Sequence, residues 1–319
     1  MRVSASIYGL GVEADAPVAA LRDLPAAGAI DVRWHLEALP AGYDRIPASA
    51  WEGYGAARGE PDEETQVRAA FAARHGLYRL LYEDGTVVVI DASGREVWAT
   101  RPRGASIEDT ATYLLGPVMG FVLRLRGTPC LHASAVAFQG RALAIAAHAG
   151  GGKSSTAAAF ARMGLPVLTD DVLAISRDAG GFQVRPAYPR VRLWPESVAA
   201  MFGAADALPR ITPTWDKRYL PLSGEGFQRE PVALGAIFLL DDRQAGGAAA
   251  FERLAPAEAL VWLVAHGYSI RLLDRDMRAR EFEWLSEVAA RVPTWRVRPA
   301  RDIGRIDDLC KDILRHASL

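Results

Sequence analysis

A glycine-rich segment near the middle of the chain constrains the fold more than any other feature. Residues 147–155 read Ala-His-Ala-Gly-Gly-Gly-Lys-Ser-Ser, after an apolar run at 142–146 and before an alanine-rich run at 156–162. This order is typical of a phosphate-binding loop between a buried strand and a helix. The glycines let backbone N–H groups turn inward, and the helix N-terminus adds the positive end of its dipole. The chain is therefore expected to bind a nucleoside triphosphate.

The loop residues divide the tasks of holding phosphate and metal. The positions expected to contact the nucleotide are the last loop residues and the first helical ones: Ala149, Gly150, Gly151, Gly152, Lys153, Ser154 and Ser155. Lys153 supplies a mobile cation for the outer phosphates, and Ser154 supplies a hydroxyl for Mg²⁺. The usual pattern opens with glycine, whereas this chain has Ala147 at that position. A plain glycine-rich turn between a strand and a helix is the alternative interpretation.

Two adjacent acids, Asp170 and Asp171, lie inside an apolar run at 167–175. Neighbouring carboxylates are costly to bury unless they bind something positive, and a phosphate site that contains Mg²⁺ supplies such a partner. One carboxylate can hold the metal while the other accepts a proton from an attacking hydroxyl, as acids do in phosphoryl transfer. Both acids can face one site only at a tight turn or a strand end. A simple Asp-Asp turn between strands is the alternative.

His132 is a polar residue within the apolar run 130–138. This run is expected to pair with the strand that leads into the glycine loop, so the imidazole can reach the phosphates. A histidine satisfied within the core fits the same pattern. The residues alone leave both readings open.

Composition excludes several classes of function. The chain has 319 residues, of which half are hydrophobic, and its formal net charge of -1 gives no overall attraction to nucleic acid or to an anionic membrane. Cys130 and Cys310 cannot build a disulfide framework or a zinc site, which indicates a reducing compartment. The sequence has neither a signal-peptide core nor an apolar run of about 18 residues. We therefore expect a cytoplasmic protein without nucleic-acid or membrane partners.

Residues 1–104 are expected to form a small α+β domain. Its clearest pattern is a three-strand meander with turns at Glu-Asp-Gly and Asp-Ala-Ser-Gly. A long loop is expected at 39–64, which is rich in Pro, Gly, Ala and acidic residues, and a short helix at 64–74. The expected strands of this domain lie at 3–8, 30–36, 78–82, 86–90 and 96–100.

Residues 105–319 are expected to form an α/β domain. Its first helix begins after a capping box at Ser106, runs from Ile107 to about Leu125 and bends at Gly116-Pro117. Strands are then expected at 131–138, 141–146, 166–169, 172–176, 182–185, 236–240 and 294–298, with helices at 257–266, 280–292 and 302–316.

The Leu131-His132 pair, the phosphate loop at 149–156 and the 168–171 segment that ends in Asp-Asp together resemble the C-terminal kinase domain of HPr kinase/phosphorylase. That family phosphorylates a serine on the phosphocarrier protein HPr. The resemblance covers about residues 128–240. It implies a P-loop kinase domain of the HPr kinase/PEP-carboxykinase-like type after the small α+β domain, with ATP and Mg²⁺ as cofactors.

The resemblance also implies roles for individual residues. Asp170 looks like the catalytic base, Asp171 and Ser154 like the Mg²⁺ contacts, and His132 like the active-site histidine. Arg218 is similar to a catalytic arginine of the family and is the third catalytic candidate. Arg190 lies near a family Arg-Gly segment but lacks its glycines. A surface charge is the alternative for either arginine.

The chain departs from the family in its missing Arg-Gly-Leu-Gly and Pro-Gly-Arg-Asn signatures and in its first hundred residues. We therefore expect a divergent kinase that phosphorylates a serine of a peptide or small protein other than HPr, as do kinases of lasso-peptide precursors. The resemblance also suggests a homo-oligomer. A kinase of a small hydroxylated metabolite and a nucleotide-binding regulatory module with little transfer activity are the alternatives. The acceptor, the choice of ATP or GTP, and reverse phosphorolysis stay open.

Overall fold

The computed structural model describes residues 2–22, 24–54, 67–178, 180–244 and 247–318. The chain divides into two compact units, one formed by Met1–Thr128 with Ser269–Arg280 and the other by Pro129–Tyr268 with Glu281–Leu319. The first helical segment after residue 104 thus groups with the N-terminal unit, which differs from the boundary expected from the sequence. The mixed α/β character of the chain is confirmed.

The first unit is built on an eight-stranded sheet in the order β1-β2-β3-β8-β7-β6-β5-β4. Its strands are β1 (Val3–Ile7), β2 (Leu10–Ala14), β3 (Val32–Leu36), β4 (Glu52–Gly53), β5 (Val67–Ala72), β6 (Leu77–Tyr82), β7 (Val87–Asp91) and β8 (Glu96–Thr100). β3 runs parallel to β2 and β8, and the other pairs are antiparallel. The meander expected from the sequence is confirmed as β6, β7 and β8.

The short helix expected at 64–74 is wrong wherever the structure describes it. Residues 67–72 form β5, which pairs with β6 along its full length, and a 3₁₀ turn follows at Ala73–His75. The alanines favour a helix locally, but pairing with a neighbouring strand overrides that weak preference. Residues 64–66 of the expected helix, and 55–64 of the expected long loop, lie outside the described residues.

The helix expected after residue 105 is confirmed, with an irregular segment at Gly116-Pro117. α1 (Ile107–Tyr113) begins at a capping box in which Ser106 N–H donates to Asp109 at 2.7 Å. A π-helical segment, Leu114–Val118, contains the proline and leads directly into α2 (Met119–Leu125).

The second unit is built on another eight-stranded sheet. Its strands are β9 (Cys130–Phe138), β10 (Arg141–Ala147), β11 (Val167–Thr169), β12 (Val172–Asp178), β13 (Gly181–Arg185), β16 (Val232–Leu240), β17 (Ala250–Arg253) and β18 (Thr294–Arg298). The order is β10-β9-β12-β13-β16-β18-β17, and β10 also pairs with β16, which closes five strands into a ring. β10, β16 and β18 are parallel neighbours, so their carboxyl ends lie at the same edge.

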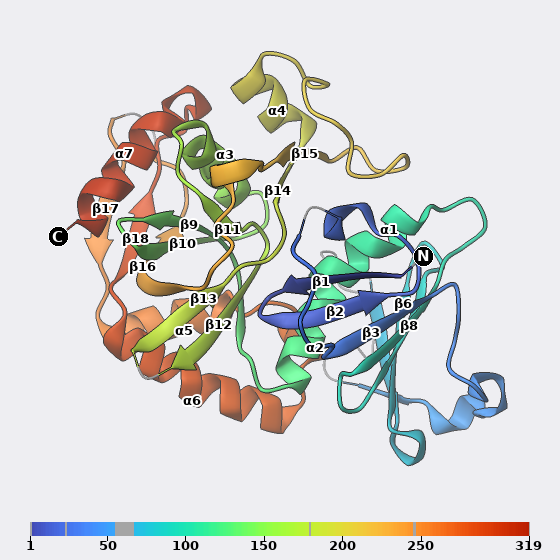
Figure 1. Ribbon diagram of the computed structural model, residues 1–319. Coiled ribbons are helices and arrows are strands. Elements are labelled where there is room, and N and C mark those ends of the chain that lie inside the picture. Colours follow the sequence, from blue (N-terminus) through green and yellow to red (C-terminus); the bar gives the residue numbers. More distant parts are fainter. Residues whose placement is uncertain (1, 23, 55–66, 179, 245–246, 319) are drawn as a thin grey trace. The chain divides into compact units, whose positions relative to one another are not determined.

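Helices cover both faces of this second sheet. They are α3 (Lys153–Arg162), α5 (Pro256–Ala265), the 281–291 part of α6 (Arg275–Arg291) and α7 (Ile306–Ala317), and a further helix of this unit is α4 (Pro195–Phe202). In Figure 1, α3 and α7 lie on one face and α5 and α6 on the other. Alternation along β10 supports this arrangement, because Ala142, Ala144 and Ala146 join the core under α5 and α6. A separate ribbon of β14 (Arg190–Leu193) and β15 (Arg218–Pro221) was not expected. No helix in the described part of the chain has the length and apolar character needed to span a membrane.

Candidate functional site

The glycine loop follows the carboxyl end of β10 and leads directly into α3, as the sequence predicts. Gly150 and Gly152 have φ angles of 72° and 100°, which side chains rarely tolerate. A Cβ on Gly151 would lie 2.7 Å from that of Ala147. The three consecutive glycines are therefore required by the backbone of this loop. Ala147, which replaces the usual first glycine, lies against the middle one.

The start of α3 is held to the loop by its own hydrogen bonds. Thr156 donates through its N–H and its Oγ1 to the Gly152 carbonyl, at 2.8 and 2.9 Å. Ser155 Oγ donates to Ser197 Oγ of α4 at 3.2 Å. The N–H groups of the first helical turn lie at the positive end of the helix dipole, which is an arrangement suited to phosphate.

Asp170 and Asp171 lie in a tight turn between β11 and β12, closed by a 2.7 Å hydrogen bond from Thr169 Oγ1 to the Val172 carbonyl. Asp170 is only 6% exposed. Its Oδ1 accepts from Ser134 Oγ at 3.1 Å and its Oδ2 from Arg192 N–H at 2.6 Å. The Ser154 side chain also interacts with this carboxyl and favours its ionised form. Asp170 is thus joined to the first turn of the phosphate-loop helix.

Asp171 is held by a second set of side chains. Its Oδ1 lies 3.2 Å from His132 Nε2, and its Oδ2 accepts from Tyr268 Oη at 2.8 Å and from the Arg192 guanidinium. His132 reaches Asp171 because β9 and β12 pair His132 with the next residue, Val172. The structure thus places the imidazole beside Asp171, and its contact with the phosphates stays a prediction.

Burial and charge separate the two carboxyls electrostatically. Burial raises the pKa of Asp170 and outweighs the opposing charge of Arg192. Burial opposes ionisation of Asp171 too, but Arg192 and His132 outweigh it and hold the pKa of Asp171 well below its ordinary value. One acid can therefore take up a proton more readily, and its neighbour stays ionised.

The cations of the site were only partly expected. Arg192 on β14 contacts both acids. Lys217, which precedes β15, also interacts electrostatically with both acids. Burial and the charge of Arg192 lower the pKa of Lys217, whereas Asp171 and Asp170 raise it. Lys153 of the loop also interacts electrostatically with Asp171. The site therefore combines one buried and one partly buried acid with three cations.

The arginines predicted from the sequence lie elsewhere on the same ribbon. Arg218 Nη1 donates to the Leu208 carbonyl at 3.4 Å, and Arg190 stacks 4.4 Å above the Tyr219 ring. The catalytic role of Arg218 stays a prediction. Alternation in 190–193 puts Arg190 and Arg192 on one face of β14. That signal could have found a cationic face, but only the three-dimensional path of the ribbon selects Arg192.

Ser134 is a further site residue that the sequence did not single out. It lies two positions after His132 on β9 and therefore on the same face, opposite the buried Ala133 and Ala135. This spacing is the signal that could have found it.

The donor set suits the expected ligands. Hydroxyl and carboxylate oxygens from Ser154, Asp170 and Asp171 are the ligand types that Mg²⁺ prefers, and the glycine loop suits phosphate. No group of three or more His, Cys, Asp or Glu suited to a metal occurs among the described residues. A magnesium ion here would need water and phosphate oxygens as well, which is the usual manner of Mg²⁺ binding.

No family model and no curated protein matches this chain. Among solved structures, it is similar to the Hpr(Ser) kinase/phosphatase from Coxiella burnetii, with 12% identity over 59% of this chain and 95% of that chain, and a TM-score of 0.33. This likeness is too distant to carry an argument about function. What the chain does must therefore be inferred from its own residues.

Proposed function

We propose that this chain is an Mg²⁺- and ATP-dependent kinase that transfers the γ-phosphate to a serine hydroxyl of a peptide or small protein. The observation that carries the proposal is the position of the acid pair beside the strand that leads into the glycine loop. Ser134, which donates to Asp170, lies on β9, the antiparallel neighbour of β10. The Ser154 side chain, in the first turn of the phosphate-loop helix, also interacts with the Asp170 carboxyl. A nucleotide held by the loop would thus lie beside groups able to bind a metal and accept a proton.

Each residue has a defined task in this proposal. The loop amides and Lys153 hold the β- and γ-phosphates. Mg²⁺, when bound, would neutralise the charge of these phosphates. Ser154 and the ionised Asp171 hold the metal. Asp170 accepts the proton of the attacking hydroxyl, a task that its raised pKa favours. Arg192 keeps Asp171 ionised and adds a fixed positive charge near the reacting groups.

A polypeptide acceptor is supported by the surface beside the site. Trp194 is 53% exposed, and Lys217 Nζ lies 4.5 Å above its ring. Because Lys217 interacts with both acids, this exposed indole lies close to the reacting groups. Exposed tryptophans are favoured contact points for protein partners. A small metabolite would need no such apolar surface.

Transfer from radiolabelled ATP into an extract separated by size tests the acceptor class. We expect the label on a polypeptide. After hydrolysis of that polypeptide to amino acids, we expect the label on phosphoserine. Label confined to small molecules would replace the acceptor by a metabolite. Nucleotide binding without any product would instead indicate a regulatory module.

Three variants test the assigned tasks. We expect Asp170→Asn to lower the transfer rate by about 10² to 10⁴ with little change in the Mg²⁺ concentration for half-maximal rate. Asp171→Asn should mainly raise that concentration. The matched control is Asp178→Asn, an exposed acid at the far end of β12, the strand that follows the acid pair, and it should behave as wild type. A wild-type rate for Asp170→Asn would refute its role. Interchanged effects would assign the metal to Asp170 and the proton to Asp171.

A further inference from the structure

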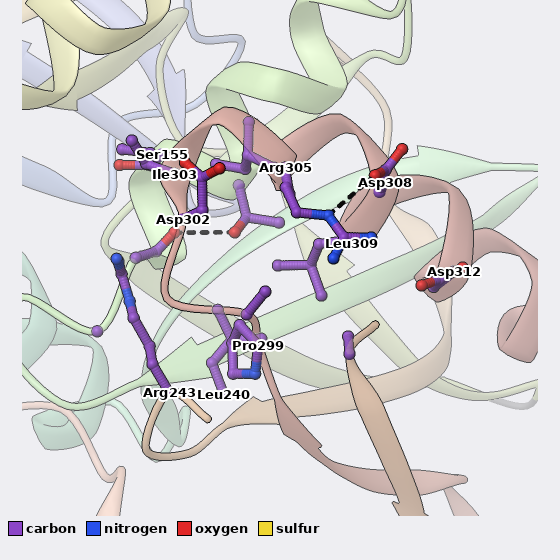
Figure 2. Close-up of a pocket in the computed structure, with 16 residues that line it drawn as sticks. Ser155, Leu240, Arg243, Pro299, Asp302, Ile303, Arg305, Asp308, Leu309 and Asp312 are labelled. Carbon is purple, nitrogen blue, oxygen red and sulfur yellow. Dashed lines mark hydrogen bonds and ion pairs between the residues drawn. The ribbon is translucent and has the colours of Figure 1, made fainter. Parts of the chain in front are cut away.

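A cavity of the second unit lies against the glycine loop. It is open on one side, and the non-atom space within it and at its mouth is about 530 Å³. Its lining includes Gly151 and Gly152 of the loop, Leu240, Pro299 and Leu309. Figure 2 shows Leu240 and Pro299 at the base of this cavity, with Leu309 above them. The same glycines thus border this cavity and the start of α3.

The position of the cavity follows from the sheet. Leu240 is the last residue of β16, Pro299 follows the last residue of β18, and the glycine loop follows β10. These three strands are parallel neighbours. The cavity therefore lies at the carboxyl ends of adjacent parallel strands, the edge at which α/β sheets bind ligands.

The lining combines an apolar base with a polar rim. Leu240 and Leu309 are 2% and 8% exposed. Most of each side chain is packed in the core, and the small part that faces the cavity is apolar. Arg243 and Asp302 lie on one side of the cavity, and Arg305 ion-pairs with Asp308 on the other (Figure 2). An apolar floor with a few polar groups around it is typical of small-molecule sites. Such a site suits a flat aromatic ring joined to a group that carries hydroxyls.

Charge argues against a second anion in this cavity. The charged residues of the lining are three aspartates and two arginines: Asp302, Asp308, Asp312, Arg243 and Arg305. Carboxylates accept hydrogen bonds from sugar hydroxyls and from the amino groups of bases. Arg243 Nη2 lies 3.5 Å from the position that a Cβ on Gly152 would occupy, so its guanidinium borders the phosphate loop. The rim thus changes from cationic beside the loop to acidic farther away.

We propose that this cavity holds the base and ribose of the nucleoside triphosphate whose phosphates bind the glycine loop. The inference rests on the proposed function, since it assigns the other end of the same nucleotide. Arg243 lies where the phosphate chain leaves the loop. The aspartates accept from the ribose or the base, and the two leucines pack against the ring.

The inference separates affinity for the nucleoside from affinity for the phosphates. In calorimetry of the full chain with Mg²⁺, we expect ATP to bind at least about tenfold more tightly than inorganic tripolyphosphate, a factor that one buried ring readily supplies. GTP as a third ligand reports the preference for the base. Equal affinities for ATP, GTP and tripolyphosphate would overturn the inference and leave the proposed function standing. Failure of all three to bind would overturn the proposed function as well.

A variant that fills the cavity provides the second test. Ala249 lines the cavity and Ala248, its exposed neighbour, does not. Ala249→Trp should weaken ATP binding at least about tenfold and leave tripolyphosphate binding unchanged, whereas Ala248→Trp should change neither. If Ala249→Trp does not fold, Ala300→Leu, at another lining residue, makes the same test. A folded filling variant with wild-type ATP affinity, or with equal losses for ATP and tripolyphosphate, would overturn the inference.

Discussion

In the first unit a buried acid binds Ser106 of its own turn, whereas in the second unit an acid of the Asp170-Asp171 pair binds side chains from distant parts of the chain. Asp109 is 2% exposed and accepts from the N–H and Oγ of Ser106, three residues away. Asp171 instead binds Arg192 and Tyr268, which come from other parts of the chain. The first arrangement completes a helix end. The charged groups around Asp171 complete no helix end or turn, and removing such charges from water is costly.

The same contrast is visible in the electrostatics. At Asp91 of the first unit, burial opposes ionisation, but N–H groups of its own turn and the Ser93 hydroxyl outweigh it and lower the pKa. At the acid pair of the second unit, two adjacent carboxyls shift in opposite directions. Opposite shifts in neighbouring acids are characteristic of functional sites. The comparison teaches that the origin of the partners, local or distant, separates structural acids from functional ones.

Among the substitutions that test this contrast between local and distant partners, removal of Arg192 should have the largest effect on activity and stability. Arg192→Ala leaves Asp171 without its main cation, so we expect phosphotransfer to fall by about 10² or more. We also expect the free energy of unfolding to fall by roughly 3–5 kcal/mol, because a largely buried ion pair loses one partner. Steady-state rates and urea denaturation measure the two effects.

Two arginines of the same ribbon serve as controls. Arg190→Ala, on the same face of β14, should stay within about tenfold of the wild-type rate, since the interaction that it loses, with the Tyr219 ring, lies outside the acid pair. Arg218→Ala tests the residue favoured by the sequence. A wild-type rate for Arg192→Ala together with lost activity for Arg218→Ala would transfer the role to Arg218.

Two serine variants should sharpen the comparison with an intermediate effect. Ser106→Ala removes the helix cap of the first unit and should lower the free energy of unfolding by about 1 kcal/mol without changing ATP affinity. Ser134→Ala removes a hydroxyl bonded to Asp170, and we expect a similar loss of stability accompanied by a lower transfer rate. Thermal unfolding measures the loss of stability in both variants, calorimetry measures ATP affinity, and steady-state transfer rates distinguish the two. Equal effects of both serines on catalysis would contradict the contrast.

The smallest expected effect is a pH dependence of stability. His266 of the second unit is 3% exposed, and burial lowers its pKa from 6.5, helped by His148, His132 and Lys153. A lowered pKa contributes stability that is present above the unfolded value and lost as the pH falls through the folded value. Between about pH 7.5 and 5.5 we therefore expect a loss below about 1 kcal/mol. His266→Phe should flatten this part of the stability profile, and an unchanged slope in urea melts would exclude His266 as its source.

Features that depend on neighbouring residues were predicted from the sequence. The glycine loop, the acid pair and the capping box at Ser106 each occupy a few consecutive positions, so local chemistry defines them. The strand 67–72 was missed because its alanines favour a helix and only the partner β6 decides otherwise. Arg192, Lys217 and Ser134 were missed for a related reason. Local spacing places Ser134 on the face of His132 and Arg192 on the face of Arg190, but only the pairing and path of distant strands bring them to the acid pair.

The central claim is that one site of the second unit binds a magnesium-bound triphosphate between the glycine loop and the two aspartates. Calorimetry of the purified full chain with ATP, in the presence and absence of Mg²⁺, tests this claim most directly. The account predicts binding that requires Mg²⁺ and is lost in Lys153→Ala, a variant of a partly exposed side chain. Absence of Mg²⁺-dependent binding of either ATP or GTP to the folded protein would contradict it.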